Sequence, residues 1–305
     1  MDSFIDKATE KIRQQVKDGH AIIGLSGGVD SSVAALLTAR AIGENLVAVF
    51  VDTGFMRKNE PQLVAKTFKG KYKLNFKSVD AREEFMQALK GVSDPEEKRK
   101  IIGHKFIEVF EREAKKSGSK FLVQGTIAPD WIETGGKIKS HHNVTLPHGM
   151  VLDLVEPLRN LYKDEVREVA RKLDLPPQIT ERMPFPGPGL AVRVLGEITP
   201  ERLEVVREAD AIVLEEIEKS DLKPWQALAA ILPGRATGIK GDSREYGYMI
   251  AIRSVESLDA MTATSMHVYW EVLQRISNRI TSEVKGVTRV LYDLTNKPPA
   301  TIEFE

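Results

Sequence analysis

The stretch that decides the fold lies near the N-terminus and reads Ala21-Ile22-Ile23-Gly24-Leu25-Ser26-Gly27-Gly28-Val29-Asp30-Ser31-Ser32. Its first five residues form a short apolar run, which predicts a buried strand over 21–25. The glycine- and serine-rich segment that follows predicts a turn, and the residues after it predict a helix through Ile42, closed by Gly43. We therefore predict a strand, a loop and a helix in direct succession.

The loop of residues 26–32 has the composition of an anion-binding site. The first turn of a helix offers unpaired backbone N–H groups and a partial positive charge, and glycines let a backbone approach an anion. The residues expected to bind phosphate or pyrophosphate are Ser26, Gly27, Gly28, Val29, Asp30, Ser31 and Ser32. Asp30 would repel a bare phosphate, so its presence indicates that Mg²⁺ binds as well, and we assign Asp30 as the metal ligand.

Two common phosphate-binding loops do not fit this stretch. It lacks the Gly-Lys-Ser/Thr of a Walker A loop and the third glycine of a dinucleotide-binding fingerprint. A plainer interpretation is a Gly-Gly turn, capped by serine and aspartate, before an ordinary helix. All seven residues of the loop suit anion binding with Mg²⁺, and they stand between a predicted strand and a predicted helix, so the plain turn is the weaker interpretation.

Outward from the loop, predicted strands alternate with predicted helices. The strands span 46–51, 74–79 and 121–124, and the helices span 1–17, 61–68, 95–116 and 164–173. This alternation is typical of βαβ units, which form an open, twisted parallel sheet with helices on both faces. The predicted fold class of this part of the chain is therefore α/β.

Two segments interrupt the alternation. Residues 128–150 contain a Gly-Gly pair, a polar run and Pro147-His148-Gly149, which predicts a long loop that acts as a lid. Residues 184–189 hold three prolines and two glycines, which predicts a boundary between domains over 1–185 and 186–305. The second domain is predicted to be α+β, with strands over 190–195, 227–232, 248–253, 287–294 and 300–304 and helices over 200–219 and 266–284.

The composition excludes several functions. The 305 residues include no cysteine, so disulfides, thiolate zinc sites and a cysteine nucleophile are impossible. Basic and acidic residues balance at 44 each, which weighs against a nucleic-acid partner. The N-terminus has no apolar signal core, and no apolar run approaches the ~20 residues of a membrane helix. We expect a cytoplasmic protein that binds neither nucleic acid nor membrane.

The loop resembles that of a known family. Ser-Gly-Gly-x-Asp-Ser is the signature of the PP-loop, or N-type, ATP pyrophosphatases, which cleave ATP between its α and β phosphates and adenylylate a substrate. Further segments resemble the GMP synthetases within that group: Lys98-Arg99-Lys100-Ile101-Ile102-Gly103, Gln124-Gly125-Thr126, Lys139-Ser140-His141-His142-Asn143-Val144, Pro184-Phe185-Pro186-Gly187-Pro188-Gly189-Leu190 and Lys297-Pro298-Pro299-Ala300-Thr301-Ile302-Glu303. The resemblance runs from about Ile22 to the C-terminus.

The resemblance implies a reaction, a fold and partners. GMP synthetases use ATP and Mg²⁺ to adenylylate O2 of xanthosine monophosphate (XMP), and ammonia then displaces AMP to give GMP. The implied fold is an adenine nucleotide alpha hydrolase-like domain, followed by a domain that forms a homodimer. Because the chain has no cysteine for a class I glutaminase, it resembles the two-subunit archaeal form, and we expect a separate glutaminase subunit.

The resemblance also assigns residues outside the loop. Val51 and Gly125 are expected to contact ATP, with adenine at the backbone of Val51. Asp130, Glu133 and Lys139 of the lid are expected to be catalytic together with Asp30. Residues expected to bind the substrate are Arg99, Gly187, Pro188, Lys297, Ile302 and Glu303. Within the lid, Thr145-Leu146 stands where family members often have Gly-Gly.

Plain structural roles compete with several of these assignments. Val51 also fits a core valine, and Arg99 also fits a solvated basic face. His141 and His142 are adjacent, so in a strand they would point to opposite faces, and we do not expect them to bind zinc. Two functions of other classes stay open at this point, a PP-loop tRNA-modifying enzyme and a nucleotide-binding module without catalysis.

Overall fold

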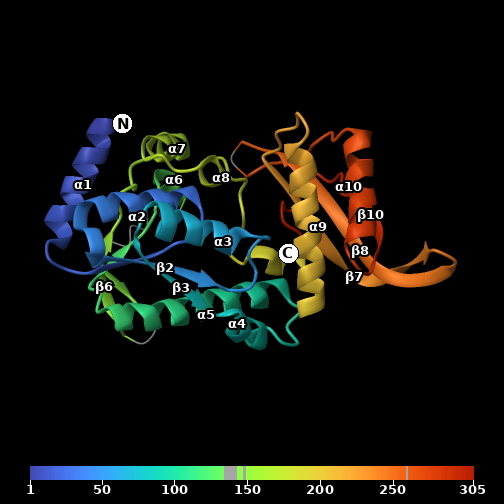
Figure 1. The fold of residues 1–305 in the computed structure, drawn as a ribbon, viewed down its shortest axis with the longest axis horizontal. Helices are drawn as coiled ribbons and strands as arrows, with labels where there is room; N and C mark the ends of the chain where they lie inside the picture. The colour runs from blue at the N-terminus through green and yellow to red at the C-terminus, as the bar shows by residue number, and fades with distance from the viewer. Residues whose placement is uncertain (134–142, 147–148, 259) are drawn as a thin grey trace. The chain divides into compact units, whose positions relative to one another are not determined.

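The computed structural model describes residues 1–133, 143–146, 149–258 and 260–305. They form two compact units, each treated separately below (Figure 1). The first unit comprises residues 1–53, 59–81 and 104–182, and the second comprises residues 54–58, 82–103 and 183–305. Two short early segments thus belong to the same unit as the C-terminal third of the chain.

Within the described residues, the sheet of the first unit has six strands in the order β3-β2-β1-β4-β6-β5. The strands are β1 (Ala21–Gly24), β2 (Leu46–Asp52), β3 (Asn75–Asp80), β4 (Phe121–Val123), β5 (Asn143–Thr145) and β6 (Val151–Val155). Every neighbouring pair is parallel except β5 and β6, which are antiparallel. The predicted α/β fold with an open parallel sheet is confirmed, and β5 adds an antiparallel edge strand that we did not predict.

Helices lie on both faces of this sheet. Helices α1 (Asp2–Val16) and α7 (Lys163–Lys172) pack against α2 (Val29–Ile42). Figure 1 shows α2 and α7 on one face and α5 (Pro95–Ser117) on the other. A Cβ added to Gly24 of β1 would lie 3.5 Å from the Phe110 ring, so the part of α5 in this unit packs directly on the central strand.

Regular structure occupies both ends of the predicted lid. Residues Ala128–Glu133 form helix α6, and Asn143–Thr145 form the edge strand β5. The prediction of one long loop over 128–150 was therefore wrong at these ends, because β5 finds backbone partners on β6 that its own sequence does not reveal. Residues 134–142 and 147–148 lie outside the described residues.

The first unit also contains shorter helical segments. Helix α3 (Glu60–Ala65) continues into a π-helical turn over Lys66–Lys71, which agrees with the helix predicted over 61–68. The short helix α8 (Pro177–Thr180) precedes the end of the unit and was not predicted. No helix in the described ranges combines the length and the apolar character needed to cross a membrane.

The second unit is built on a mostly antiparallel sheet. Strands β7 (Gln226–Lys240) and β8 (Ser243–Glu256) form a long antiparallel hairpin, and the short β9 (Thr264–Ser265) is antiparallel to β8. Strand β10 (Val287–Tyr292) is parallel to β8. This sheet, together with the helices of the same unit, confirms the predicted α+β fold of the C-terminal part.

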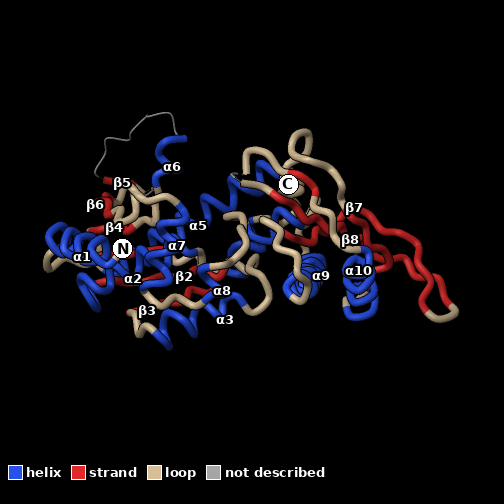
Figure 2. The backbone as a smooth tube through the Cα atoms, turned by 90° about the horizontal axis from the view of Figure 1, so that it is seen from above, coloured by secondary structure: helices blue, strands red, loops and turns tan. Residues whose placement is uncertain are grey.

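Two long helices cover the sheet of the second unit. Helix α9 (Pro200–Glu218) packs against β7, and α10 (Trp270–Glu283) packs against β10 and α9. Figure 2 shows α9 and α10 lying side by side. Thr199 caps α9 by accepting a hydrogen bond from the backbone of Arg202 at 3.2 Å. The short helix α4 (Arg82–Ala88) also belongs to this unit.

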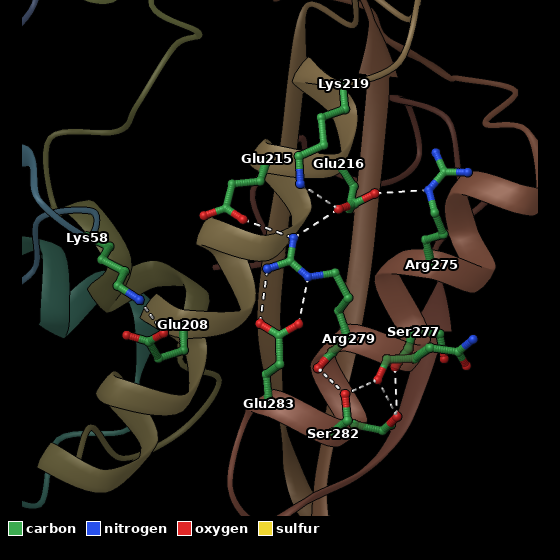
Figure 3. A network of polar contacts seen from close by, with 12 residues as sticks. Lys58, Glu208, Glu215, Glu216, Lys219, Arg275, Ser277, Arg279, Ser282 and Glu283 are labelled. Carbon is green, nitrogen blue, oxygen red and sulfur yellow. Dashed lines mark hydrogen bonds and ion pairs between the residues drawn. The ribbon is translucent and has the colours of Figure 1, made fainter.

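A network of charges joins α9 to α10 (Figure 3). Arg279 lies 2.9 Å from both Glu215 and Glu216, and Arg275 lies 3.0 Å from Glu216. The Glu216 side chain is only 5% exposed. Burial alone would raise the pKa of Glu216, but hydrogen bonds from Arg275, Arg279 and Lys219 lower that pKa to about 2. The network therefore stabilises the ionised carboxylate between the two helices.

Two predicted strands of the second unit were wrong. The run over 190–195 is mostly a 3-10 helix, Gly189–Arg193, because Gly189 adopts φ 64° and Arg193 turns inward to pair with Asp210 at 2.7 Å. The run over 300–304 forms no strand in the described structure. Its carbonyl groups at Thr301 and Ile302 instead accept hydrogen bonds from Arg253, at 3.0 and 2.9 Å.

One predicted helix of the second unit was too long at its start. The helix predicted over 266–284 begins at Trp270, because β9 and the extended backbone of Tyr269 precede it. Its predicted end agrees with the structure, since α10 ends at Glu283.

Candidate active site

The predicted anion-binding loop connects β1 to the N-terminus of α2. Strand β1 lies between β2 and β4, with β2 and β3 on one side and β4, β6 and β5 on the other. The strand order therefore reverses next to β1, and doubly wound sheets bind ligands outside the carboxyl ends of their strands at this point. The topology places the loop where such a fold binds nucleotides.

The two glycines of the loop have different tasks. Gly27 adopts φ 74°, a left-handed conformation that favours glycine. A Cβ on Gly27 would lie 3.0 Å from Nη1 of Arg182 and 3.1 Å from a methyl group of Val64, so the position is also sterically closed. Gly28 is extended, with φ −80°, and is the N-cap residue of α2.

The serines form a hydrogen-bonded frame within the loop. The hydroxyl groups of Ser26 and Ser31 are 3.0 Å apart, and Ser26 Oγ accepts from the backbone N–H of Gly28 at 3.3 Å. Ser32 is fully buried and donates its hydroxyl proton to the carbonyl oxygen of Gly28 at 2.6 Å. Its hydroxyl, predicted to bind phosphate, thus stabilises the loop in this structure, while Ser26 is exposed.

Asp30 lies in the first turn of α2 and carries the chemistry expected of a metal ligand. Its Oδ2 accepts from Nζ of Lys163 at 2.6 Å. Its Oδ1 is buried and has no hydrogen-bond partner among the described residues. A buried carboxylate oxygen without a partner is costly unless a cation or a donor completes it. The site therefore fits Mg²⁺, which prefers one or two carboxylates together with substrate phosphates.

Gly125 contacts the same turn of α2 from the neighbouring strand. It follows β4, and a Cβ at this position would lie 2.8 Å from the carbonyl carbon of Asp30 and 2.9 Å from the nitrogen of Ser31. Any larger residue would push the connection after β4 away from the loop. The structure thus brings Gly125 and the loop together, and it gives glycine a steric reason there.

Val51 lies near the carboxyl end of β2, the strand next to β1. Its side chain is 2% exposed, and it pairs in register with Val79 of β3. The buried side chain shows that Val51 is a core residue. Adenine binding remains compatible with this, because adenine would contact the backbone of Val51. Contact of Val51 with adenine stays a prediction.

Part of the lid residues lie within the described structure. Asp130 is exposed, and its Oδ2 accepts from the backbone N–H of Ile127 at 2.9 Å, which caps the start of α6. Glu133 is the last residue of α6. Lys139, His141 and His142 lie outside the described residues. The catalytic roles assigned to Asp130, Glu133 and Lys139 stay predictions.

In the second unit, the predicted substrate residues near the C-terminus are held by internal contacts. The backbone of Lys297 pairs with that of Ala263 through hydrogen bonds of 2.7 and 3.0 Å. The Lys297 Nζ donates to the carbonyl oxygen of Ala260 at 2.8 Å. Ile302 is 7% exposed and packs with Val255 and Ala263. Its side chain therefore belongs to the core.

Glu303 belongs to a buried charge network. Both of its carboxylate oxygens accept from Arg193 at 2.9 Å, and Oε1 also accepts from Gln226 at 2.6 Å. Arg193 is fully buried and pairs with Asp210 at 2.7 Å. Burial opposes the charged guanidinium, yet the carboxylates of Asp210 and Glu303 raise the pKa of Arg193 above its usual value. The sequence did not indicate this network.

The remaining substrate residues differ in exposure. Arg99 is exposed on α5 and pairs with Glu96 one turn earlier. Its neighbour Lys98 is fully buried, pairs with Glu305 and donates to the carbonyl oxygen of Val194 at 2.7 Å. Burial lowers the pKa of Lys98. The basic run thus contains one internal cation and at least one exposed cation.

Gly187 and Pro188 lie in the turn before the 3-10 helix. Gly187 is exposed and Pro188 is partly buried. The glycine that the turn requires is the next one, because a Cβ on Gly189 would lie 2.4 Å from the carbonyl oxygen of Phe55. The exposed position of Gly187 is compatible with substrate contact, which stays a prediction.

Comparison with known proteins identifies the family. The model of the GMP synthase C terminal domain matches residues 215–304, and that of NAD synthase matches residues 4–120. The B subunit of glutamine-hydrolyzing GMP synthase from Thermococcus kodakarensis is 65% identical over 305 residues, which is 100% of this chain and 99% of that protein. The chain belongs to the family of GMP synthase B subunits.

Two further relatives from this family agree with the assignment. The GMP synthase B subunits of Pyrococcus horikoshii and Methanocaldococcus jannaschii are each 63% identical to this chain, over 99% of the chain and 98% of their own length. The resemblance to GMP synthetases is therefore confirmed, and the chain is the synthetase component of a carbon–nitrogen ligase. Neither of the alternative functions is favoured.

Proposed function

We propose that this chain converts XMP to GMP at the expense of ATP, through an adenylylated XMP intermediate. The observation that carries the proposal is the loop after β1, where Asp30 keeps a buried oxygen without a hydrogen-bond partner among the described residues. Full-length similarity to the GMP synthase B subunits supports the reaction. In the first step O2 of XMP attacks the α-phosphate and pyrophosphate leaves; in the second, ammonia attacks C2 and AMP leaves with that oxygen.

Different residues of the first unit bind different parts of ATP. The backbone N–H groups at the start of α2 and the exposed hydroxyl of Ser26 bind the pyrophosphate part. Asp30 would hold Mg²⁺ through the oxygen that lacks a partner within the described residues, and a bound Mg²⁺ would supply positive charge for the leaving pyrophosphate. The backbone of Val51 binds adenine, and Gly125 keeps the connection after β4 clear of the loop.

The remaining assigned residues act on the substrate. Asp130, Glu133 and Lys139 complete the adenylylation site, with the lysine stabilising charge that develops at the α-phosphate. Arg99, Gly187 and Pro188 bind XMP together with the C-terminal segment. In that segment Lys297 binds the substrate phosphate and Glu303 accepts a hydrogen bond from the base, and Ile302 between them belongs to the same nucleotide site.

The nitrogen donor requires a second protein. The relatives are named as one subunit of a glutamine-hydrolyzing enzyme, and this chain has no cysteine to serve as a glutaminase nucleophile. We propose that a separate class I glutaminase subunit supplies ammonia and that this chain forms a homodimer through its C-terminal unit. Cytoplasmic location follows from the same biosynthetic role.

Pyrophosphate release from the purified chain tests the proposal. Mg-ATP, XMP and an ammonium salt are expected to give pyrophosphate, AMP and GMP in equal amounts, and omission of XMP is expected to stop the release. Glutamine is expected to replace ammonium only after the glutaminase subunit is added. Release that does not depend on XMP, or absence of GMP, would remove the proposal.

A further inference from the structure

An arginine that the sequence did not indicate lies against the loop after β1. Arg182 follows the short helix α8 and is the last residue of the first unit. Its Nη1 donates to the carbonyl oxygen of Ser26 at 3.5 Å. A Cβ added to Gly27 would lie 3.0 Å from the same Nη1, so the guanidinium packs directly on the peptide group that joins Ser26 to Gly27.

A buried carboxylate holds this arginine in place. Arg182 forms an ion pair with Glu60, the first residue of α3. The two side chains are 13% and 8% exposed, and both residues belong to the first unit. A pair that is shielded from solvent restricts the guanidinium more than an exposed pair would. Arg182 therefore supports the loop from inside the unit and does not present its charge at the surface.

The loop needs such a restraint because of Gly27. Gly27 adopts φ 74°, and glycine accepts positive and negative φ with similar ease. The peptide between Ser26 and Gly27 is therefore free to turn over, which would exchange the directions of its carbonyl oxygen and its N–H. In one orientation the peptide offers a donor to an anion, and in the other it offers a carbonyl oxygen that repels the anion.

Arg182 selects the orientation that suits an anion. In a trans peptide the C=O and N–H bonds point in opposite directions. The carbonyl oxygen of Ser26 faces Nη1 of Arg182, so the N–H of Gly27 points away from the guanidinium. No described residue accepts a hydrogen bond from that N–H, so it is available to a ligand. The hydrogen bond from a cation also polarises the peptide, which makes its N–H a stronger donor.

We propose that Arg182 is a positioning residue of the pyrophosphate site. It keeps the peptide between Ser26 and Gly27 turned so that Gly27 donates its backbone N–H to pyrophosphate, and Glu60 keeps Arg182 in place. Arg182 itself does not contact the phosphate groups. This inference rests on the proposed function of the loop, and it assigns the orientation of one peptide group to a side chain 156 residues away in sequence.

The amide signal of Gly27 reports on this orientation. The sequence has two Ser-Gly pairs, Ser26-Gly27 and Ser117-Gly118, so a chain made by cell-free synthesis with ¹³C-carbonyl serine and ¹⁵N-glycine shows these two amides selectively. Magnesium pyrophosphate is expected to move the Gly27 proton signal downfield in the wild type, because a hydrogen bond forms. Gly118, whose N–H already donates to Lys115 at 3.3 Å, is the internal control. Binding without a Gly27 shift would contradict the inference.

The same titration in variants, with calorimetry for the affinity, tests Arg182. Arg182→Met is expected to bind magnesium pyrophosphate about five-fold more weakly and to lose most of the Gly27 shift, because part of the molecules then hold the peptide turned over. Arg182→Lys is expected to recover most of both, since an ammonium group can donate to the same carbonyl oxygen. Arg171→Met is the control, because Arg171 forms an exposed ion pair with Glu181 at 3.5 Å. Either an unchanged Gly27 shift in Arg182→Met or an affinity equal to that of the control would overturn the inference.

A second comparison covers the case in which Arg182→Met does not fold, since that variant removes the cation beside the buried carboxylate of Glu60. Glu60→Gln and the double variant Glu60→Gln/Arg182→Met both lack that carboxylate, and only the first keeps the arginine beside Ser26. The double variant is expected to bind magnesium pyrophosphate about five-fold more weakly than Glu60→Gln and to show a smaller Gly27 shift. Equal binding and equal shifts in these two variants would overturn the inference.

The outcomes separate this inference from the proposed function. Wild-type binding of magnesium pyrophosphate without XMP-dependent turnover would remove GMP synthesis and leave the Arg182 comparison valid. Normal XMP-dependent turnover by the wild type, together with an unchanged Gly27 shift and affinity in Arg182→Met, would remove only the role of Arg182.

Discussion

The loop of residues 26–32 and the C-terminal segment of residues 297–305 each carry a carboxylate that the sequence assigns to a ligand, but the two carboxylates are used differently. Asp30 gives one oxygen to Lys163, and its other oxygen is buried without a hydrogen-bond partner among the described residues. Glu303 gives both oxygens to Arg193 and shares one with Gln226. Asp30 therefore has one carboxylate oxygen available to a ligand, as its proposed metal role requires. Both oxygens of Glu303 already form hydrogen bonds within the second unit, so this carboxylate stabilises the fold.

The largest expected effect comes from the C-terminal side of this comparison. Arg193→Met removes the buried cation that pairs with both Asp210 and Glu303 and leaves Asp210 only its 3.6 Å ion pair with Arg57, so we expect a loss of about 3–5 kcal/mol in the free energy of unfolding. Denaturant unfolding measures it. The control is Arg13→Met, which removes an ion pair with Glu10 whose side chains are 52% and 53% exposed, and we expect it to cost about 1 kcal/mol or less. Similar costs for the two variants would show that the buried network does not hold the segment.

The next effect concerns the loop. Asp30→Asn is expected to lower XMP-dependent pyrophosphate release by about a hundred-fold or more, because the carboxylate that binds Mg²⁺ is lost. Unfolding stability is expected to stay near that of the wild type, since an amide fits the same space. Asp164→Asn, at a side chain that is 95% exposed on α7, serves as the control and is expected to retain activity. Near-normal turnover by Asp30→Asn would refute the metal role.

The pH dependence of stability tests the buried carboxylate of Glu216 in the second unit. The pKa of Glu216 is lowered to about 2 in the folded chain from 4.5, so its contribution is present above pH 4.5 and is lost as pH falls toward 2. Glu216→Gln is expected to reduce stability at neutral pH by about 2–3 kcal/mol. This loss of stability is expected to become smaller as the pH falls from 4.5 toward 2. Glu215→Gln, at a 51% exposed side chain, should show little of either effect. A pH-independent difference from the wild type would exclude ionisation as the cause.

The smallest effect tests a substrate role within the C-terminal segment. Lys297→Ala is expected to raise the KM for XMP by about ten-fold while the KM for ATP stays unchanged, because one phosphate contact is lost. Lys297 also donates to the carbonyl oxygen of Ala260, so thermal unfolding is measured alongside. Lys285→Ala, at an exposed lysine after α10, is the control. An unchanged KM for XMP would remove Lys297 from the substrate site.

The sequence predicted correctly the elements whose structure depends on interactions within a few residues. The apolar run at 21–25 and the glycines after it predicted β1, the loop and α2, because burial, φ and helix capping act within a few residues. The metal role of Asp30 was proposed on similar grounds, since a carboxylate in an anion-binding loop is unusual in itself, and it stays a prediction. The family signature covers these residues as well.

Contacts between distant residues account for what the sequence did not predict. The ion pair of Asp30 with Lys163 joins two helices, and neither residue's neighbours indicate the other. The run over 300–304 has the pattern of a strand, but Arg253 takes two of its carbonyl groups and no ladder forms among the described residues. A buried arginine cannot be distinguished from an exposed one by its residue type alone.

The position of a heavy-oxygen label tests the central claim most directly. XMP that carries the isotope at O2 is incubated with Mg-ATP, ammonium and the purified chain, and the products are analysed by mass spectrometry. Attack of O2 on the α-phosphate transfers that oxygen to the phosphate of AMP, so we expect one labelled oxygen in AMP for each GMP formed. Unlabelled AMP, or ADP and phosphate in place of AMP and pyrophosphate, would contradict adenylylation of XMP at this site.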